Sequence, residues 1–237
     1  MMAAAAPARR LPFKPVPRDT VQDRVHRQIR DLILDGEIEP GQTVTLQSLA
    51  DAFGVSIMPV REALHRLTAE KALTVIAGRS VGIPPLSVER FRDLRRVRVE
   101  IEGVAARWAA ESITAEELSR LDELIATMEA CSANGEQRAF VPANREFHFA
   151  IYRAARSDCL MTMIEPLWLQ IGPYLALLRG SGSWRIANDQ HRSLAAALAR
   201  RDGEAARRAL VADIDEAGAL LERILIDRAG TVAVLPR

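Results

Sequence analysis

The segment spanning residues 46–73, LQSLADAFGVSIMPVREALHRLTAEKAL, places the tightest constraint on how this chain can fold. Apolar residues recur at helical spacing on both sides of Gly54, which favours two short helices joined by a tight turn. Gly54 can adopt the left-handed backbone that ends a helix. Ser56 stands at a favoured N-cap position, and Pro59 falls in the opening turn of the second helix, where its missing N–H costs little.

The second of these helices would have one apolar face and one cationic edge. Its apolar positions recur three or four residues apart, at Val60, Ala63, Leu64 and Leu67. The residues outside that stripe include Arg61, His65 and Arg66. A helix that packs by its apolar stripe and exposes a polar edge can enter the major groove of DNA. Helical hairpins without this function show the same pattern, so the flanking segments matter.

Those flanking segments favour a winged helix–turn–helix domain over residues 19–84. Apolar residues at helical spacing between Val21 and Ile33 predict a preceding helix, followed by turns at Gly36 and Gly41. Residues 73–83 alternate in a pattern that predicts a β-hairpin turning at Gly78-Arg79. The resulting order is a helix, a helix–turn–helix and a two-stranded wing.

The rest of the chain predicts an all-helical bundle over residues 87–228, so the fold class is mainly α with a small β wing. Pro166 and Pro173 should bend or interrupt the fourth of six predicted helices. In the first, residues 88–112, an apolar stripe should face the core: Phe91, Leu94, Val97, Ile101, Val104 and Trp108.

Composition limits the partners and the compartment. The net charge of +1 excludes a strongly basic protein, so any affinity for nucleic acid must come from local clusters. Two cysteines are too few for a disulfide framework and fit a reducing cytoplasm. No apolar run reaches the roughly 18 residues of a spanning helix, which argues against a membrane partner. Residues 1–18 should form a disordered basic arm, and residues 229–237 a loose tail.

A few polar residues of the bundle could bind a metal ion. Asn144 and His148 are one helical turn apart, a spacing that suits two ligands of one ion. His191 is the second histidine of the bundle, and Asp213 lies beside positions expected in the core, where a carboxylate needs a partner. A lone histidine on a helix is more often structural, so both interpretations stay open. The sequence contains no nucleophile–base pattern, phosphate loop or paired-cysteine zinc motif.

Two motifs resemble a known family. The run from Val55 to Leu64, with its PVREAL core, resembles the signature of GntR-family bacterial transcription regulators. The C-terminal half resembles the FadR-type sensor domain of that family, the FCD domain, an antiparallel helical bundle. The marks of that domain here are Arg98-x-x-Ile101-Glu102, Asn144-x-x-x-His148, His191 and Asp213.

The resemblance implies a homodimer that binds a palindromic operator in double-stranded DNA. Arg61 matches the position that contacts DNA in the family, and Ser56 would contact phosphate. Gln47 and Ile57 stand where relatives often carry Arg, so the family's usual operator is not expected. The implied DNA-contacting set is Gln47, Ser56, Ile57, Met58, Arg61, Arg66, and Gly78 and Arg79 of the wing tip, with Ile57 and Met58 packing on thymine methyl groups.

The resemblance also implies a divalent metal ion, such as zinc, manganese, nickel or iron, held by Asn144, His148, His191 and Asp213. Asp213 stands where His is usual, which makes the site richer in oxygen and should change its affinity. The implied effector is a small carboxylate bound with help from Arg98, although a few members of the family sense acyl chains. The resulting prediction is a ligand-responsive regulator, usually a repressor.

Two other functions stay open at this point. The histidines and the carboxylate could belong to a metal-dependent enzyme fused to a DNA-binding domain. Alternatively, the chain could be an architectural DNA-binding protein whose pocket is vestigial.

Overall fold

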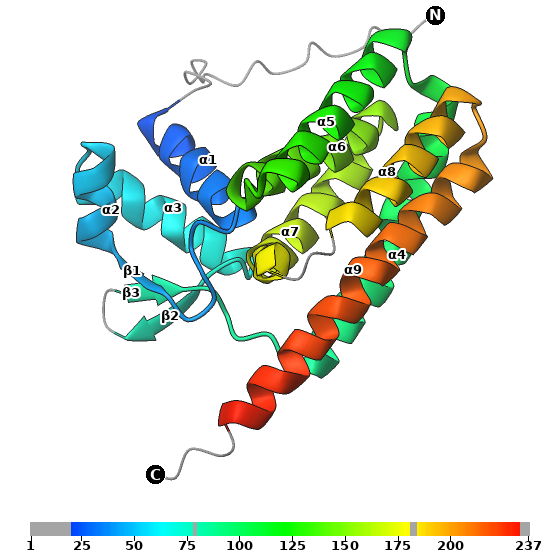
Figure 1. Ribbon diagram of the computed structural model, residues 1–237. Helices are drawn as coiled ribbons and strands as arrows, with labels where there is room; N and C mark the ends of the chain where they lie inside the picture. Colours follow the sequence, from blue (N-terminus) through cyan, green and yellow to red (C-terminus); the bar gives the residue numbers. More distant parts are fainter. Residues whose placement is uncertain (1–19, 78–79, 181–183, 233–237) are drawn as a thin grey trace, which may run out of the picture.

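The computed structural model describes residues 20–77, 80–180 and 184–232, and these residues are mostly helical (Figure 1). Helix α1 (Val21–Leu34) begins at Thr20, whose hydroxyl accepts a hydrogen bond from the backbone N–H of Asp23. The Asp23 carboxylate accepts one from the Thr20 backbone N–H in return, which completes a capping box. The apolar face of α1 packs against α3 of the helix–turn–helix.

The predicted helix–turn–helix is present as α2 (Leu46–Phe53) and α3 (Ile57–Ala69). Gly54 ends α2 in the left-handed conformation, with φ of 63°. Ser56 is the N-cap of α3, and its side chain makes no capping hydrogen bond. The predicted apolar stripe of α3 is buried: Val60, Ala63, Leu64 and Leu67.

A three-stranded antiparallel sheet forms the wing, with β1 (Thr43–Thr45), β3 (Ser80–Gly82) and β2 (Thr74–Ala77) in that order. Strand β1 pairs with β3 in the register Val44 to Val81. The sequence did not predict β1, because three residues are too few to show an alternating pattern. The predicted turn at residues 78–79 lies outside the described residues.

In the described residues after the wing, six helices and one short 3-10 segment form the bundle: α4 (Val88–Ser112), α5 (Ala115–Asn134), α6 (Gln137–Ala154), α7 (Asp158–Leu175), η1 (Ala176–Gly180), α8 (Trp184–Ala199) and α9 (Gly203–Val232). Figure 1 shows α4 and α9 side by side along the bundle, and these two helices make extensive contact. Among the described residues, no helix combines the length and the apolar character needed to cross a bilayer.

Two expectations about helix ends need correction. Helix α7 is not interrupted at Pro166 or Pro173, because it is held by buried apolar side chains on both sides of these prolines, such as Ile164 and Leu169. Helix α9 continues to Val232, so residues 229–232 of the predicted loose tail are helical. Residues 233–237 and the predicted N-terminal arm lie outside the described residues.

The predicted core face of α4 is partly wrong. Phe91 and Leu94 are buried as expected, but Val97 and Trp108 are 38% and 40% exposed. The buried face of α4 instead carries a charged pair and small residues: Arg98, Glu102, Gly103, Ala105, Ala106, Ala109 and Ala110. Small side chains allow close helix packing, and the charged pair is satisfied internally, so the core face of α4 is rotated partly away from its most hydrophobic stripe. Ile101 and Val104 are half-buried and still pack against the core.

Candidate functional site

The predicted DNA-contacting residues lie at the exposed edge of the helix–turn–helix. Ser56 and Arg61 are exposed, and the apolar side chain of Met58 is 56% exposed. Ile57 is half-buried and packs against the core of the domain. The first turn of α3 therefore presents a mixed polar and apolar surface to solvent.

Two other residues of that set are engaged within the domain. Arg66 forms an ion pair with Asp23 of α1, with 3.1 Å between Nη1 and Oδ1. Gln47 donates a hydrogen bond of 2.8 Å from its side-chain amide to Asp51. Both pairs are solvent-exposed and can exchange for other partners at little cost. Gly78 and Arg79 lie outside the described residues.

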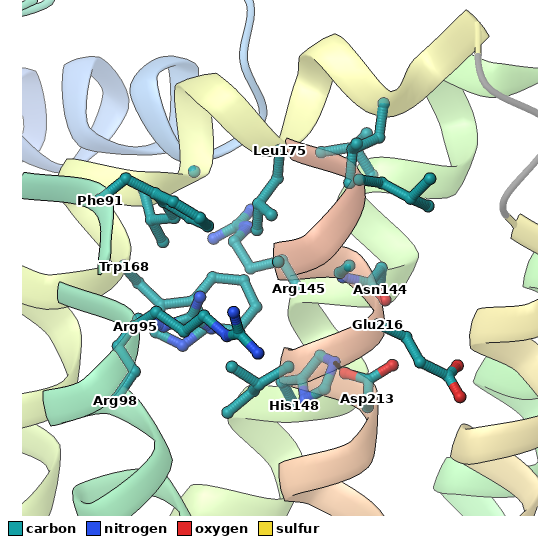
Figure 2. A pocket seen from close by; sticks show the side chains of 18 of the residues that line it. Phe91, Arg95, Arg98, Asn144, Arg145, His148, Trp168, Leu175, Asp213 and Glu216 are labelled. Carbon is teal, nitrogen blue, oxygen red and sulfur yellow. Dashed lines mark ion pairs between the residues drawn. The ribbon is translucent and has the colours of Figure 1, made fainter. Parts of the chain in front are cut away.

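Helices α6, α8 and α9 bring the predicted metal ligands together. His148 Nε2 lies 3.3 Å from one oxygen of Asp213, and His191 Nε2 lies 3.4 Å from the other. All three side chains are buried, and one potential ligand atom from each lies within 4.8 Å of the others. Asn144 lies one turn before His148 on α6, and Asn144, His148 and Asp213 line one cavity of the bundle (Figure 2).

The buried nitrogens of His191 provide a test of whether this cluster fits a metal ion. Neither Nδ1 nor Nε2 has a hydrogen-bond partner of acceptable geometry among the described residues. A buried imidazole without partners is costly, and coordination to a divalent ion would satisfy one of its nitrogens. Two imidazoles, a carboxylate and a nearby amide suit zinc, manganese, nickel or iron. The residues present therefore fit the predicted group.

The electrostatics of the cluster also suit ligation. Burial lowers the pKa of His191 to about 4, against the opposing effect of the Asp213 charge, so the ring is neutral at neutral pH. Burial acts to raise the pKa of Asp213, but His191, His148 and Arg98 together outweigh it and hold that pKa below its usual value. A neutral imidazole and an ionised carboxylate are the forms that bind metal ions.

A second group of side chains, missed by the sequence analysis, supports His148. The Tyr152 hydroxyl lies 3.4 Å from Nδ1 of His148 and donates a hydrogen bond to Glu102. This contact directs Nε2 of His148 towards Asp213, as an outer partner does for a metal-bound histidine. Tyr152 stands four residues after His148, so helical spacing could have identified it.

Glu102 also binds Arg98, the predicted effector residue. Arg98 donates hydrogen bonds of 2.6 and 3.2 Å to the two carboxylate oxygens, and its guanidinium lies 5.2 Å from the ring centre of Trp168. Arg98 is only 6% exposed but lines the cavity. The Arg98-x-x-x-Glu102 spacing belongs to the motif noted in the sequence, although the pairing was not predicted.

A cavity of about 340 Å³ lies above the cluster (Figure 2). One part of its lining is apolar and includes Phe91, Phe140, Trp168 and Leu175. Its cationic side chains are Arg95, Arg98, Arg145 and Arg223, against the carboxylates of Asp213 and Glu216. This volume is sufficient for a small molecule. Arg95, Arg98 and Arg145 already pair with Asp215, Glu102 and Asp35, so an anionic molecule would share these guanidinium groups with their carboxylates.

Comparison with known proteins identifies both parts of the chain. The model for bacterial regulatory proteins of the gntR family matches residues 21–83, and the FCD domain model matches residues 93–216. The HTH-type transcriptional regulator McbR of Escherichia coli (strain K12) is 31% identical over 190 residues, which cover 79% of this chain and 86% of that protein.

Other relatives agree with this assignment. The probable D-xylose utilization operon transcriptional repressor of Paenarthrobacter nicotinovorans is 29% identical over 199 residues, covering 83% of this chain and 87% of that protein. The solved structure of E. coli McbR/YncC matches with a TM-score of 0.81 at 29% identity, over 86% of this chain and 98% of that chain. These relatives are transcription regulators and not enzymes, which removes the enzyme interpretation. The chain is therefore a transcription regulator of the GntR family, with a helix–turn–helix domain followed by an FCD domain.

Proposed function

We propose that this protein is a ligand-responsive repressor that binds a palindromic operator as a homodimer in the cytoplasm. An anionic effector, in our proposal a small carboxylate, binds in the bundle and weakens the hold on DNA. The observation that carries this proposal is the cavity of the bundle. Its lining combines members of the His148–His191–Asp213 cluster with several arginines and with apolar side chains. One relative is itself described as a probable transcriptional repressor.

The DNA contacts would come from the first two turns of α3. Arg61 is exposed and can donate two parallel hydrogen bonds to guanine, while Met58 can pack on a thymine methyl group. The hydroxyl of Ser56, at the N-terminus of α3, makes no capping hydrogen bond and can donate a hydrogen bond to a phosphate.

The effector site would use the cluster and Arg98. His148, His191, Asp213 and Asn144 would hold the metal ion, which supplies a Lewis acid with open positions for a carboxylate oxygen. Arg98 lies beside the cluster and stays charged because Glu102 is its partner. The apolar wall around Trp168 would exclude water from the bound carboxylate and strengthen these contacts.

The dimer proposal is supported by the exposed stripe of α4. Val97 and Trp108 are exposed, and Ile101 and Val104 lie between them at helical spacing and are half-buried. A continuous apolar stripe on a helix surface is a common sign of a protein interface. Packing of this stripe against the same stripe of a second copy would give the two-fold symmetry that a palindromic operator requires.

The proposal can be tested by selecting the operator from randomised DNA and then titrating effectors. The Arg61→Ala variant should lose about 10- to 100-fold in operator affinity per half-site and keep the dimer folded. The matched control is Arg120→Ala, an exposed arginine of α5, which should leave operator affinity unchanged. Unaltered footprints from Arg61→Ala, or a failure of every carboxylate to stabilise the protein in thermal-shift assays, would contradict the proposal.

A further inference from the structure

The cavity in the bundle is closed in part by the winged domain. Leu34, the last residue of α1, lines the cavity. Next to it, α1 and α7 touch backbone to backbone: a Cβ added at Gly172 would lie 3.2 Å from the Leu34 carbonyl oxygen. A molecule in this cavity is therefore in reach of both domains.

Arg145 links the same two parts through charge. It lies on α6 between the candidate ligands Asn144 and His148, and it lines the cavity (Figure 2). Its guanidinium also reaches α1 and its C-cap: Nη1 lies 3.2 Å from Asp31, and Nε lies 2.9 Å from Asp35. The Arg145 and Asp35 side chains are only 22% and 20% exposed, so solvent screens their ion pair weakly, whereas Asp31 is 55% exposed and its pair with Arg145 is screened more.

Asp35 depends on this contact. Burial raises the pKa of Asp35 above its usual value even though Arg145 opposes the shift, and the charges of Asp31 and Glu37 add to the increase. Withdrawing Arg145 removes a cation from this half-buried carboxylate, which lies beside two others, and that loss is costly. Any group that takes Arg145 away from Asp35 therefore weakens the attachment of α1 to the bundle.

We propose that the effector carries a second anionic group, which binds Arg145 in competition with Asp31 and Asp35 and so releases the end of α1 from the bundle. This inference rests on the proposed function and specifies its ligand as a short diacid. One carboxylate would lie at the His148–Asp213 end and the other at Arg145. Residues three apart on a helix have Cβ atoms about 5–6 Å apart, a span that suits a short diacid.

Competition for Arg145 is reciprocal: the ligand weakens the contact with the two aspartates, and the two aspartates weaken the binding of the ligand. If the ligand and the two aspartates compete for one guanidinium, removal of the aspartates must tighten ligand binding. A substitution in the DNA-binding domain would then improve binding in the sensor domain. A purely structural role for the ion pairs predicts the opposite or no effect.

Calorimetric titration of the full-length, zinc-loaded protein tests this with α,ω-dicarboxylates from malonate to adipate and matched monocarboxylates. We expect at least one diacid to bind more tightly than its monocarboxylate. Arg145→Gln should weaken that diacid by about 10-fold or more, because it removes a charge-assisted contact. The Asp31→Asn/Asp35→Asn double variant should tighten it by about 3- to 10-fold, and this gain should vanish in the Arg145→Gln background.

The matched control is Glu165→Gln, which removes the ion pair of Arg30 with Glu165, 3.1 Å apart. This pair also joins α1 to α7, but neither residue lines the cavity. Diacid affinity should stay unchanged in this variant. Equal tightening by Glu165→Gln would show that a looser interface, and not competition for Arg145, causes the effect, which overturns the inference.

The remaining outcomes separate this inference from the proposed function. If monocarboxylates bind as tightly as diacids and Arg145→Gln changes neither, the inference is wrong and the proposed function stands. If the double variant leaves diacid affinity unchanged, the competition is likewise refuted. If no carboxylate binds to any variant, both proposals fail together.

Discussion

The DNA-reading edge and the effector cavity are built in opposite ways. The edge is formed by α2, α3 and the turn between them, which are consecutive in the sequence, and its side chains face solvent. The metal-type cluster draws one residue from each of α6, α8 and α9, and all three are buried. A local surface can be altered at little cost in stability, whereas a buried polar cluster assembled from distant segments cannot.

The arginines show this difference most clearly. Arg61 is exposed on α3, and no hydrogen bond or ion pair holds it among the described residues. Arg98 is buried and held by both oxygens of Glu102. The same side chain thus serves as an available donor in one region and as part of the core in the other.

The largest effect that would sharpen this comparison is expected at Glu102. Glu102→Ala leaves Arg98 charged and buried without its partner, which should lower the free energy of unfolding by about 3–5 kcal/mol. Glu100 also lies on α4, and its exposed carboxylate pairs with Arg207 of α9. Glu100→Ala should cost less than about 1 kcal/mol. Urea unfolding measures both, and equal costs would contradict the comparison. Glu102→Gln, which keeps an acceptor, provides a folded intermediate case.

The pH dependence of the metal-free protein should come next in size. His191 is protonated below about pH 6.5 in the unfolded protein but only below about pH 4 in the folded protein. Between these pH values the unfolded state therefore binds more protons. Stability should fall with falling pH across that window, by about 1.4 kcal/mol per unit and about 3 kcal/mol in total. His148 and Asp213 face this ring. Because the pKa of Asp213 is lowered in the folded state, the stability that its charge contributes is lost only below the pH range from 6.5 to 4.

Chemical denaturation in a chelator at several pH values between 7 and 4 measures this slope. The His191→Asn variant should flatten it. His65→Asn, at an exposed position of α3, should leave it unchanged. A slope that persists in His191→Asn would assign the effect to another group.

Metal affinity gives a somewhat smaller expected effect. His148→Ala removes one ligand and should weaken zinc binding by about 100-fold or more in competition with a chromophoric chelator. Tyr152→Phe removes the contact behind His148, together with the hydrogen bond to Glu102, and should weaken zinc binding by about 10-fold. Wild-type zinc affinity in His148→Ala would show that the cluster holds no metal ion.

The smallest effect is expected for Gly→Ala changes at two helix ends, one in each domain, and the loss of stability should be the same at both. Gly54 and Gly135 both end helices in the left-handed conformation, with φ of 63° and 71°, and an added Cβ at either would meet nothing within 4 Å. Each Gly→Ala change should therefore cost about 1–2 kcal/mol from backbone strain alone. Differential scanning calorimetry of the two variants compares them directly, and a much larger cost at Gly54 would reveal contacts that its turn makes.

The sequence predicted those features whose causes are local. Gly54 as the end of α2 and Ser56 as the N-cap of α3 follow from preferences that act within a few residues. Helical spacing drew attention to Asn144 and His148, and a polar residue beside core positions to Asp213, while the resemblance to the FadR-type sensor domain added His191 and implied the full set. Their meeting place required the fold.

Only the tertiary structure decided which face of α4 is buried and how the two domains share a cavity. Hydrophobicity favoured the stripe through Val97 and Trp108, yet the face with Arg98 and Glu102 is the one that contacts Tyr152 of α6 and Trp168 of α7. The charges on this face are paired, and its alanines allow a close approach that bulky side chains prevent. The contact of Arg145 with Asp31 and Asp35 joins residues more than a hundred positions apart. Preferences within a helix determine where it begins and ends, but partners that distant meet only when the helices pack.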